Sequence, residues 1–160
     1  MKHIIGIADM KVSSKPDDTL ITYALGSCLG ITAYDPVAKV GGMIHIMLPL
    51  SSVNPNKAKE NPYMFVDSGV PEFFRACYKA GAVKQRMIVK VAGGASTHQS
   101  DKEDQFQIGK RNFLMLRKLL WKNNVLIESF DVGAKHSRTM LLDMETGDVT
   151  LKIQNEETKL

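Results

Sequence analysis

Cys28 and His45 are the two side chains in this sequence whose types and spacing best suit nucleophilic chemistry. They lie in two strand-like runs, residues 28–34 and 40–48, which are separated by turn residues at 35–38. If the turn is a four-residue loop, counting outward from it places Cys28 directly opposite His45. Directly opposed side chains share a face of the sheet, with Cβ atoms about 4.5 to 5.5 Å apart. The spacing therefore predicts that a thiol and an imidazole meet across one hairpin.

Such a pair could attack a carbonyl carbon. An imidazole accepts the proton of a thiol, and the resulting thiolate is the nucleophile. Gly26 and Ser27 precede Cys28, and we expect the backbone there to approach a substrate closely and its N–H groups to hold a developing oxyanion. A five-residue loop would shift the register by one residue and separate the pair.

The residues leave other interpretations open. Cys28 could be a small buried hydrophobic residue and His45 an ordinary core histidine, while Cys77 lies on a helical apolar face and is expected to pack in the core. The run from Gly26 to Gly30 also fits a nucleophile elbow with Cys in place of Ser, completed by Asp131 and His136. Only 27 residues precede Cys28, however, and an α/β-hydrolase places several strands before its elbow. The four histidines show no paired spacing, so no metal site is expected.

Composition narrows the class of protein. The chain has 160 residues, of which 44% are hydrophobic and 24% charged, as in an ordinary globular domain. We expect one domain over residues 1–153 and a flexible tail at 154–160. The net charge of +4 is scattered rather than gathered into a stripe, which argues against a nucleic-acid partner. No apolar run approaches the about 20 residues that span a bilayer, and no secretory signal opens the chain, so a cytoplasmic protein with free thiols is expected.

Hydrophobic periodicity predicts an α+β fold, a layered arrangement of sheet covered by two or three helices. Helices are expected within residues 63–79 and around 113–120, and an exposed loop at 49–62. A polar stretch is expected at 97–105. Strands are expected at the following positions: 4–8, 19–24, 28–34, 40–48, 87–92, 125–130, 139–144 and 149–153.

Several segments of the chain resemble the CheD family of chemoreceptor glutamine deamidases. They are residues 22–28, which read TYALGSC; residues 35–49, DPVAKVGGMIHIMLP; residues 90–96, KVAGGAS; and the shorter matches at 63, 66–67, 108–109, 111–112, 131–133, 138 and 145–147. The likeness follows the order of nearly the whole chain. One departure is visible, because the family usually has paired glycines after its aspartate, where this chain has Val132 and Gly133 after Asp131.

The resemblance implies a function and a catalytic set. In that family a Cys, a His and a Thr act together, and the matching positions are Cys28, His45 and Thr22. It implies cofactor-free hydrolysis of glutamine side chains to glutamate on the cytoplasmic helices of methyl-accepting chemotaxis receptors, and a mostly antiparallel layered sandwich similar to bacterial toxin cysteine deamidases. It further implies the CheC phosphatase as a partner. The alternative is a non-enzymatic adaptor that binds receptors and CheC.

Overall fold

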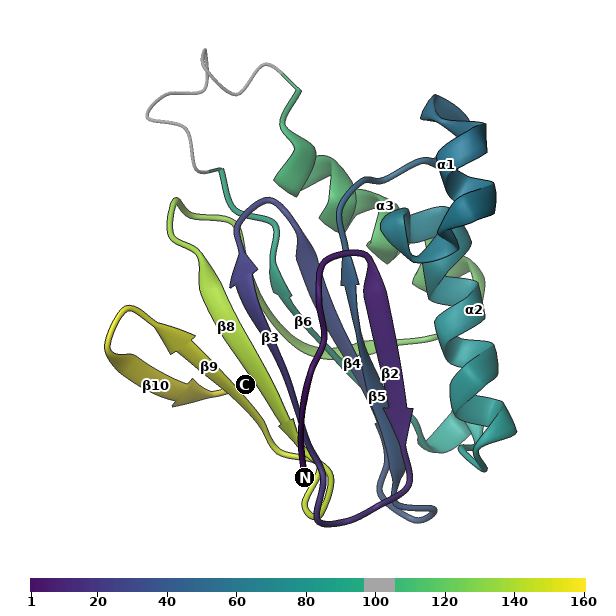
Figure 1. The fold of residues 1–160 in the computed structure, drawn as a ribbon, viewed down its shortest axis with the longest axis vertical. Helices are drawn as coiled ribbons and strands as arrows, with labels where there is room; N and C mark the ends of the chain where they lie inside the picture. The colour runs from purple at the N-terminus through teal and green to yellow at the C-terminus, as the bar shows by residue number, and fades with distance from the viewer. Residues whose placement is uncertain (97–105) are drawn as a thin grey trace.

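Two five-stranded sheets and a layer of helices make up the computed structural model, which describes residues 1–96 and 106–160 (Figure 1). The polar stretch expected at 97–105 lies outside the described residues. The outer sheet has the strand order β1-β3-β8-β9-β10 and the central sheet the order β2-β5-β4-β6-β7. The strands of the outer sheet are β1 (Lys2–Ile4), β3 (Thr19–Leu25), β8 (Arg138–Asp143), β9 (Val149–Ile153) and β10 (Glu156–Lys159). Those of the central sheet are β2 (Asp9–Ser13), β5 (Val40–Ile46), β4 (Leu29–Asp35), β6 (Ile88–Gly93) and β7 (Ile127–Val132).

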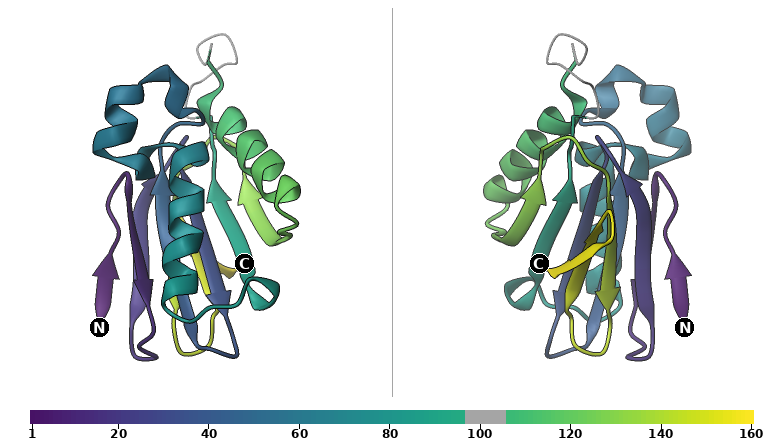
Figure 2. Two further views of the ribbon diagram at one scale, coloured as in Figure 1. Left: turned by 90° about the vertical axis from the view of Figure 1, so that its right-hand side faces the viewer. Right: turned by 90° about the vertical axis from the view of Figure 1, so that its left-hand side faces the viewer.

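The layers are ordered outer sheet, central sheet, helices, as Figures 1 and 2 show. Helix α2 (Val66–Lys79), which continues through Pro71, and helix α3 (Ile108–Lys122) pack on one face of the central sheet. A short helix α1 (Pro55–Glu60) precedes them. The 3-10 turns are Ser51–Val53, Pro62–Met64 and Lys84–Arg86. The predicted α+β layered fold is confirmed, and its pairing is mostly antiparallel, with β1-β3 and β6-β7 as the parallel pairs.

Alternation along the central strands divides the core into two parts. On β4, Leu29, Ile31 and Ala33 face the helices. Gly30, between them, faces the outer sheet, because a Cβ added there would meet Leu25 and Met140. Side chains of successive strand residues point to opposite faces, so this parity decides which residues lie between the two sheets.

The β4–β5 hairpin differs in register from the predicted one. Asp35 pairs with Val40, so the loop is residues 36–39, and His45 pairs with Gly30 instead of Cys28. Asp35 causes the difference, because its Oδ1 accepts hydrogen bonds from the N–H groups of Val37 and Ala38 at 2.9 and 3.1 Å and so closes the turn around itself. The predicted direct opposition of Cys28 and His45 is therefore wrong by two residues. A shift of two keeps the parity, so both remain on the same face.

Three other expectations differ from the structure. Of the strand expected at 4–8, only Ile4 lies in a strand, at the end of β1, and residues 5–8 turn toward β2, with Ala8 at a φ of 57°. The loop expected at 49–62 holds α1, whose start is capped by Asn54 through the Lys57 N–H at 3.2 Å. The tail expected at 154–160 contains β10, which pairs antiparallel with β9. Among the described residues, no helix has the length and apolar character that crossing a bilayer requires.

Candidate active site

Thr22 and His45 meet in the space between the two sheets. Thr22 lies on β3 of the outer sheet and His45 on β5 of the central sheet, and both are fully buried. The Thr22 Oγ1 lies 2.7 Å from the His45 Nδ1 and donates its own proton to the carbonyl of Ile5 at 2.8 Å. A hydroxyl has one proton to give, so the His45 Nδ1 must be the donor to Thr22. This fixes the tautomer of a neutral imidazole and leaves Nε2 as an acceptor.

The His45 Nε2 is a buried base. It has no hydrogen-bond partner among the described residues, and burial lowers the pKa of His45 to about 4. The imidazole is therefore neutral at pH 7, with the lone pair of Nε2 free to take a proton. A positioned neutral imidazole of this kind is the usual form of a general base.

Cys28 lies in the connection that carries the chain from β3 of the outer sheet to β4 of the central sheet. It is partly exposed and packs against the hydrophobic cluster between the sheets, on the side where Thr22 and His45 lie. Because His45 pairs with Gly30, Cys28 is its diagonal neighbour, and such positions are within reach of a long side chain. Burial raises the pKa of the Cys28 thiol, so both the thiol and the His45 imidazole are uncharged at pH 7.

Backbone hydrogen bonds hold the connection before Cys28 in place. The Gly94 N–H donates to the Cys28 carbonyl at 2.9 Å, and the Ala95 N–H donates to the Gly26 carbonyl at 2.8 Å. Gly93 makes this approach feasible, because it adopts a φ of +113° and an added Cβ would lie 2.2 Å from the Cys28 carbonyl oxygen. Any other residue at this position would push the connection away.

The two candidate oxyanion residues differ in what their N–H groups do. The Gly26 N–H donates to the Ala24 carbonyl at 2.9 Å and is therefore occupied. The Ser27 N–H has no acceptor within the part of the chain that the structure describes. The Ser27 N–H is thus a free backbone donor next to Cys28 in the chain, while Gly26 anchors the connection through its carbonyl.

Comparison with known proteins places the chain near one family of relatives. A family model described as CheD chemotactic sensory transduction matches residues 47–153. The chain is 52% identical over 149 residues, 93% of its length and 92% of the relative's, to the "Probable chemoreceptor glutamine deamidase CheD 1" of Syntrophus aciditrophicus. It is 45% identical over 157 residues, 98% of its length and 92% of the relative's, to a protein named "Probable chemoreceptor glutamine deamidase CheD" of Solibacter usitatus.

The chain belongs to the CheD family. The resemblance first noted at short motifs is confirmed by these matches. The family model begins at residue 47, after Thr22, Cys28 and His45, whereas the two relatives align with nearly the whole chain. The family model therefore does not cover the three residues, and it is their geometry in this CheD chain that supports roles for them.

Sequence reasoning missed two buried polar residues around the CheD site. Asn112, on α3, is fully buried and donates to the carbonyls of Ser27 and Met47, each at 3.0 Å. Arg138 is 2% exposed and pairs with Asp131 at 2.8 Å while donating to the Gly93 carbonyl at 3.3 Å. Asp131 is thus engaged by an arginine, which removes the carboxylate that the nucleophile-elbow interpretation needed. The signal for Asn112 was a polar residue in line with the apolar positions Leu116, one turn later, and Leu120, two turns later.

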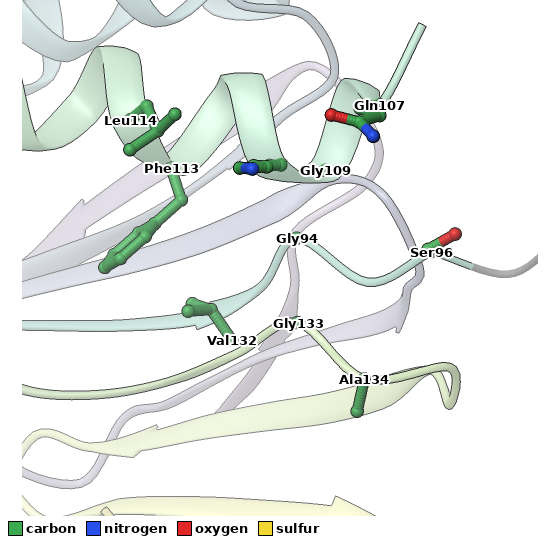
Figure 3. Close-up of a pocket in the computed structure, with 10 residues that line it drawn as sticks. Gly94, Ser96, Gln107, Gly109, Phe113, Leu114, Val132, Gly133 and Ala134 are labelled. Carbon is green, nitrogen blue, oxygen red and sulfur yellow. The ribbon is translucent and has the colours of Figure 1, made fainter. Parts of the chain in front are cut away.

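A cavity of about 380 Å³ lies behind the connection, between the start of α3 and the ends of β6 and β7 (Figure 3). Figure 3 shows Gly109, in the first turn of α3, close above Gly94. None of the three candidate catalytic side chains lines this cavity. Among the described residues, no group of three or more His, Cys, Asp or Glu side chains is arranged to hold a metal ion.

Proposed function

We propose that this CheD chain hydrolyses the side-chain amide of selected glutamines on chemotaxis receptors, which produces glutamate and releases ammonia. Its relatives carry names for this activity. The observation that carries the proposal is the hydrogen bond from His45 to Thr22, which leaves the buried Nε2 as a base on the same side of the central sheet as Cys28.

In the first half of the proposed reaction, Cys28 is the nucleophile. The His45 Nε2 takes the proton from Sγ as Sγ forms a bond to the glutamine carbonyl carbon. The carbonyl oxygen becomes an oxyanion, which the N–H groups of Ser27 and Cys28 stabilise. The imidazolium then donates its proton to the amide nitrogen, the C–N bond breaks, and ammonia leaves a thioester.

In the second half, water replaces ammonia. Neutral His45 removes a proton from the water as its oxygen attacks the thioester carbonyl carbon, and the C–S bond breaks to release glutamate. The sulfur recovers its proton from the imidazolium, which restores the neutral pair. Thr22 accepts the hydrogen bond from Nδ1 throughout, so Nε2 is the ring nitrogen that takes and gives the proton in both halves.

An exposed apolar groove suits a helical protein partner. Its volume is about 590 Å³, and Leu114 and Phe106, which line it, are 52% and 67% exposed. Arg111 and Lys118 add positive charge to its lining. We propose that a receptor helix docks in this groove.

Two further proposals concern the surroundings of the protein. We propose that CheC phosphatase is a further partner, and that the protein works in the cytoplasm, where thiols stay reduced. The adaptor alternative would use this groove without the chemistry.

The experiment that tests the proposal mixes the purified chain with cytoplasmic fragments of candidate receptors. Released ammonia and the mass gain of Gln to Glu are measured for the wild type, for Cys28→Ser and for the control Cys77→Ala. Cys77 is fully buried in the helix-side core, so its variant should stay active. No ammonia from the wild type, or normal turnover by Cys28→Ser, would contradict the proposal. Receptor binding without turnover would favour the adaptor.

A further inference from the structure

Asn112 connects the two segments that carry Cys28 and His45. Its Nδ2 donates to the Ser27 carbonyl, next to Cys28, and to the Met47 carbonyl, two residues after His45, each at 3.0 Å. We call these two hydrogen bonds the Asn112 bridge. The Asn112 side chain is fully buried. The bridge thus ties the connection before β4 to the chain after β5 at one point.

The orientation of the amide follows from its partners. Carbonyl oxygens only accept hydrogen bonds, so two of them can be served only by the NH₂ group. The Oδ1 must then point away, and it has no partner among the described residues. Leaving a buried acceptor unpaired is unfavourable, and such groups are rare in native cores.

Close packing fixes the helix that carries Asn112. Gly109, one turn earlier, lies so near the chain after β6 that an added Cβ would be 2.5 Å from the carbonyl oxygens of Gly94 and Ala95. The N–H groups of these same residues hold the carbonyls of Cys28 and Gly26. The start of α3, the end of β6 and the Cys28 connection therefore form one rigid unit.

We propose that Asn112 is a positioning residue, whose bridge sets the placement of the Cys28 thiol relative to the His45 imidazole. This inference rests on the proposed deamidase function for its kinetic consequence. The positioning role does not require Asn112 to contact the substrate. Displacement of a reacting group by about 1 Å can lower a rate about a hundredfold, so a loosened bridge should reduce kcat more than it changes KM.

The test compares Asn112→Ala and Asn112→Ser with the control Asn123→Ala. Asn123 lies at the end of the same helix and donates to the Leu119 carbonyl at 2.8 Å, away from the Cys28 connection. Receptor deamidation gives kcat and KM. Alkylation by iodoacetamide at several pH values gives the reactivity of Cys28 without any receptor. Cys77 stays silent in the folded chain, because burial raises its pKa to about 12.

With Asn112→Ala we expect kcat to fall about 10-fold to 100-fold, with KM within about threefold. Alkylation of Cys28 at pH 8 should become faster, because a released connection exposes the thiol, while Cys77 remains unmodified. Asn112→Ser, which can still serve one carbonyl, should lie between, and Asn123→Ala should match the wild type.

Unchanged kcat and unchanged alkylation in folded Asn112→Ala would overturn the proposal. So would modification of Cys77 together with Cys28, or failure of both Asn112 variants to fold, since either result assigns Asn112 to general stability. If the wild type does not act on receptors, the proposed function fails, but the alkylation data still decide whether the bridge positions Cys28.

Discussion

Thr22→Val removes the hydroxyl that orients His45 while keeping the shape of the side chain. It leaves two buried groups without partners, the Ile5 carbonyl and the His45 Nδ1–H, which now lie 2.8 and 2.7 Å from Oγ1. Each unpaired group costs about 1 to 3 kcal/mol, so the free energy of unfolding should fall by about 2 to 6 kcal/mol. That is a large part of the about 5 to 15 kcal/mol of a typical domain.

The loss in activity has a separate origin. Without Thr22 the proton of the imidazole can move to Nε2, and the ring can turn away from Cys28. If about 1 to 3 kcal/mol of orientation is lost in the transition state, kcat should fall about 5-fold to 150-fold. Thr22→Ser keeps the hydroxyl and gives up one methyl group, worth about 0.8 kcal/mol, so its kcat should stay within a few-fold of the wild type.

The assay is ammonia release from receptor fragments at a temperature where urea titration shows every variant folded. Thr32→Val is the matched control, because Thr32 is 1% exposed, faces the same space between the sheets, and makes only a long bond of 3.4 Å to the Lys90 carbonyl. A folded Thr22→Val chain with kcat within twofold of the wild type would refute the assignment of Thr22.

Three further perturbations follow from the same site. Cys28→Ala should abolish ammonia release and leave the circular dichroism spectrum unchanged, and residual turnover above a tenth of the wild type would count against the nucleophile. Burial lowers the pKa of His45 from 6.5 to about 4, so between these pH values the unfolded chain binds a proton that the folded chain does not. The free energy of unfolding should therefore fall by up to about 3 kcal/mol as the pH drops from 7 to 4.5. Urea titrations measure this slope, and His45→Asn should flatten it. Gly93→Ala should lower kcat at least about tenfold by displacing the Cys28 carbonyl, and unchanged kinetics would show that the connection adapts.

The pH window chosen for His45 avoids the buried acid of the hairpin. Burial alone would raise the pKa of Asp35, but Arg86, at 2.9 Å, and backbone N–H groups at the hairpin and at Val83 hold it well below its usual range. A carboxyl with a lowered pKa stabilises the fold above its unfolded value, near 4, and loses that effect only at lower pH. Asp35 therefore contributes little to a slope between pH 4.5 and 7, and the difference between the wild type and His45→Asn isolates the part that His45 supplies.

The sequence was sufficient for the pairing of β4 with β5 but not for its exact register. The turn residues at 35–38 correctly predicted a hairpin between β4 and β5. The position of its four-residue loop depends on the Asp35 carboxylate, which accepts hydrogen bonds from the N–H groups of Val37, Ala38 and the distant Val83. No local pattern contains that last contact. The resulting error was two residues, and period-two alternation keeps a residue on its face under such a shift.

Other elements gave weaker signals in the sequence. Strand β10 is exposed at every position, so no apolar alternation distinguishes it from a frayed tail, and it forms only because β9 offers an edge. Helix α1 has six residues and no buried side chain, which leaves an Asn cap and a proline as its only signals. Both elements are determined by their neighbours rather than by their own composition.

The candidate site also shows where the limit of sequence reasoning lies. Cys28, His45 and Thr22 could be named from the sequence as candidates. They come together only because two different sheets face each other, since Thr22 contacts His45 from β3 while Cys28 lies in the connection between the sheets. The residues that hold this crossing, such as Gly93 and Asn112, act through backbone carbonyls, which have no identity in a sequence. A candidate nucleophile can thus be proposed from residue types and spacing, whereas the contacts that would position it emerge only when distant main-chain segments are brought together.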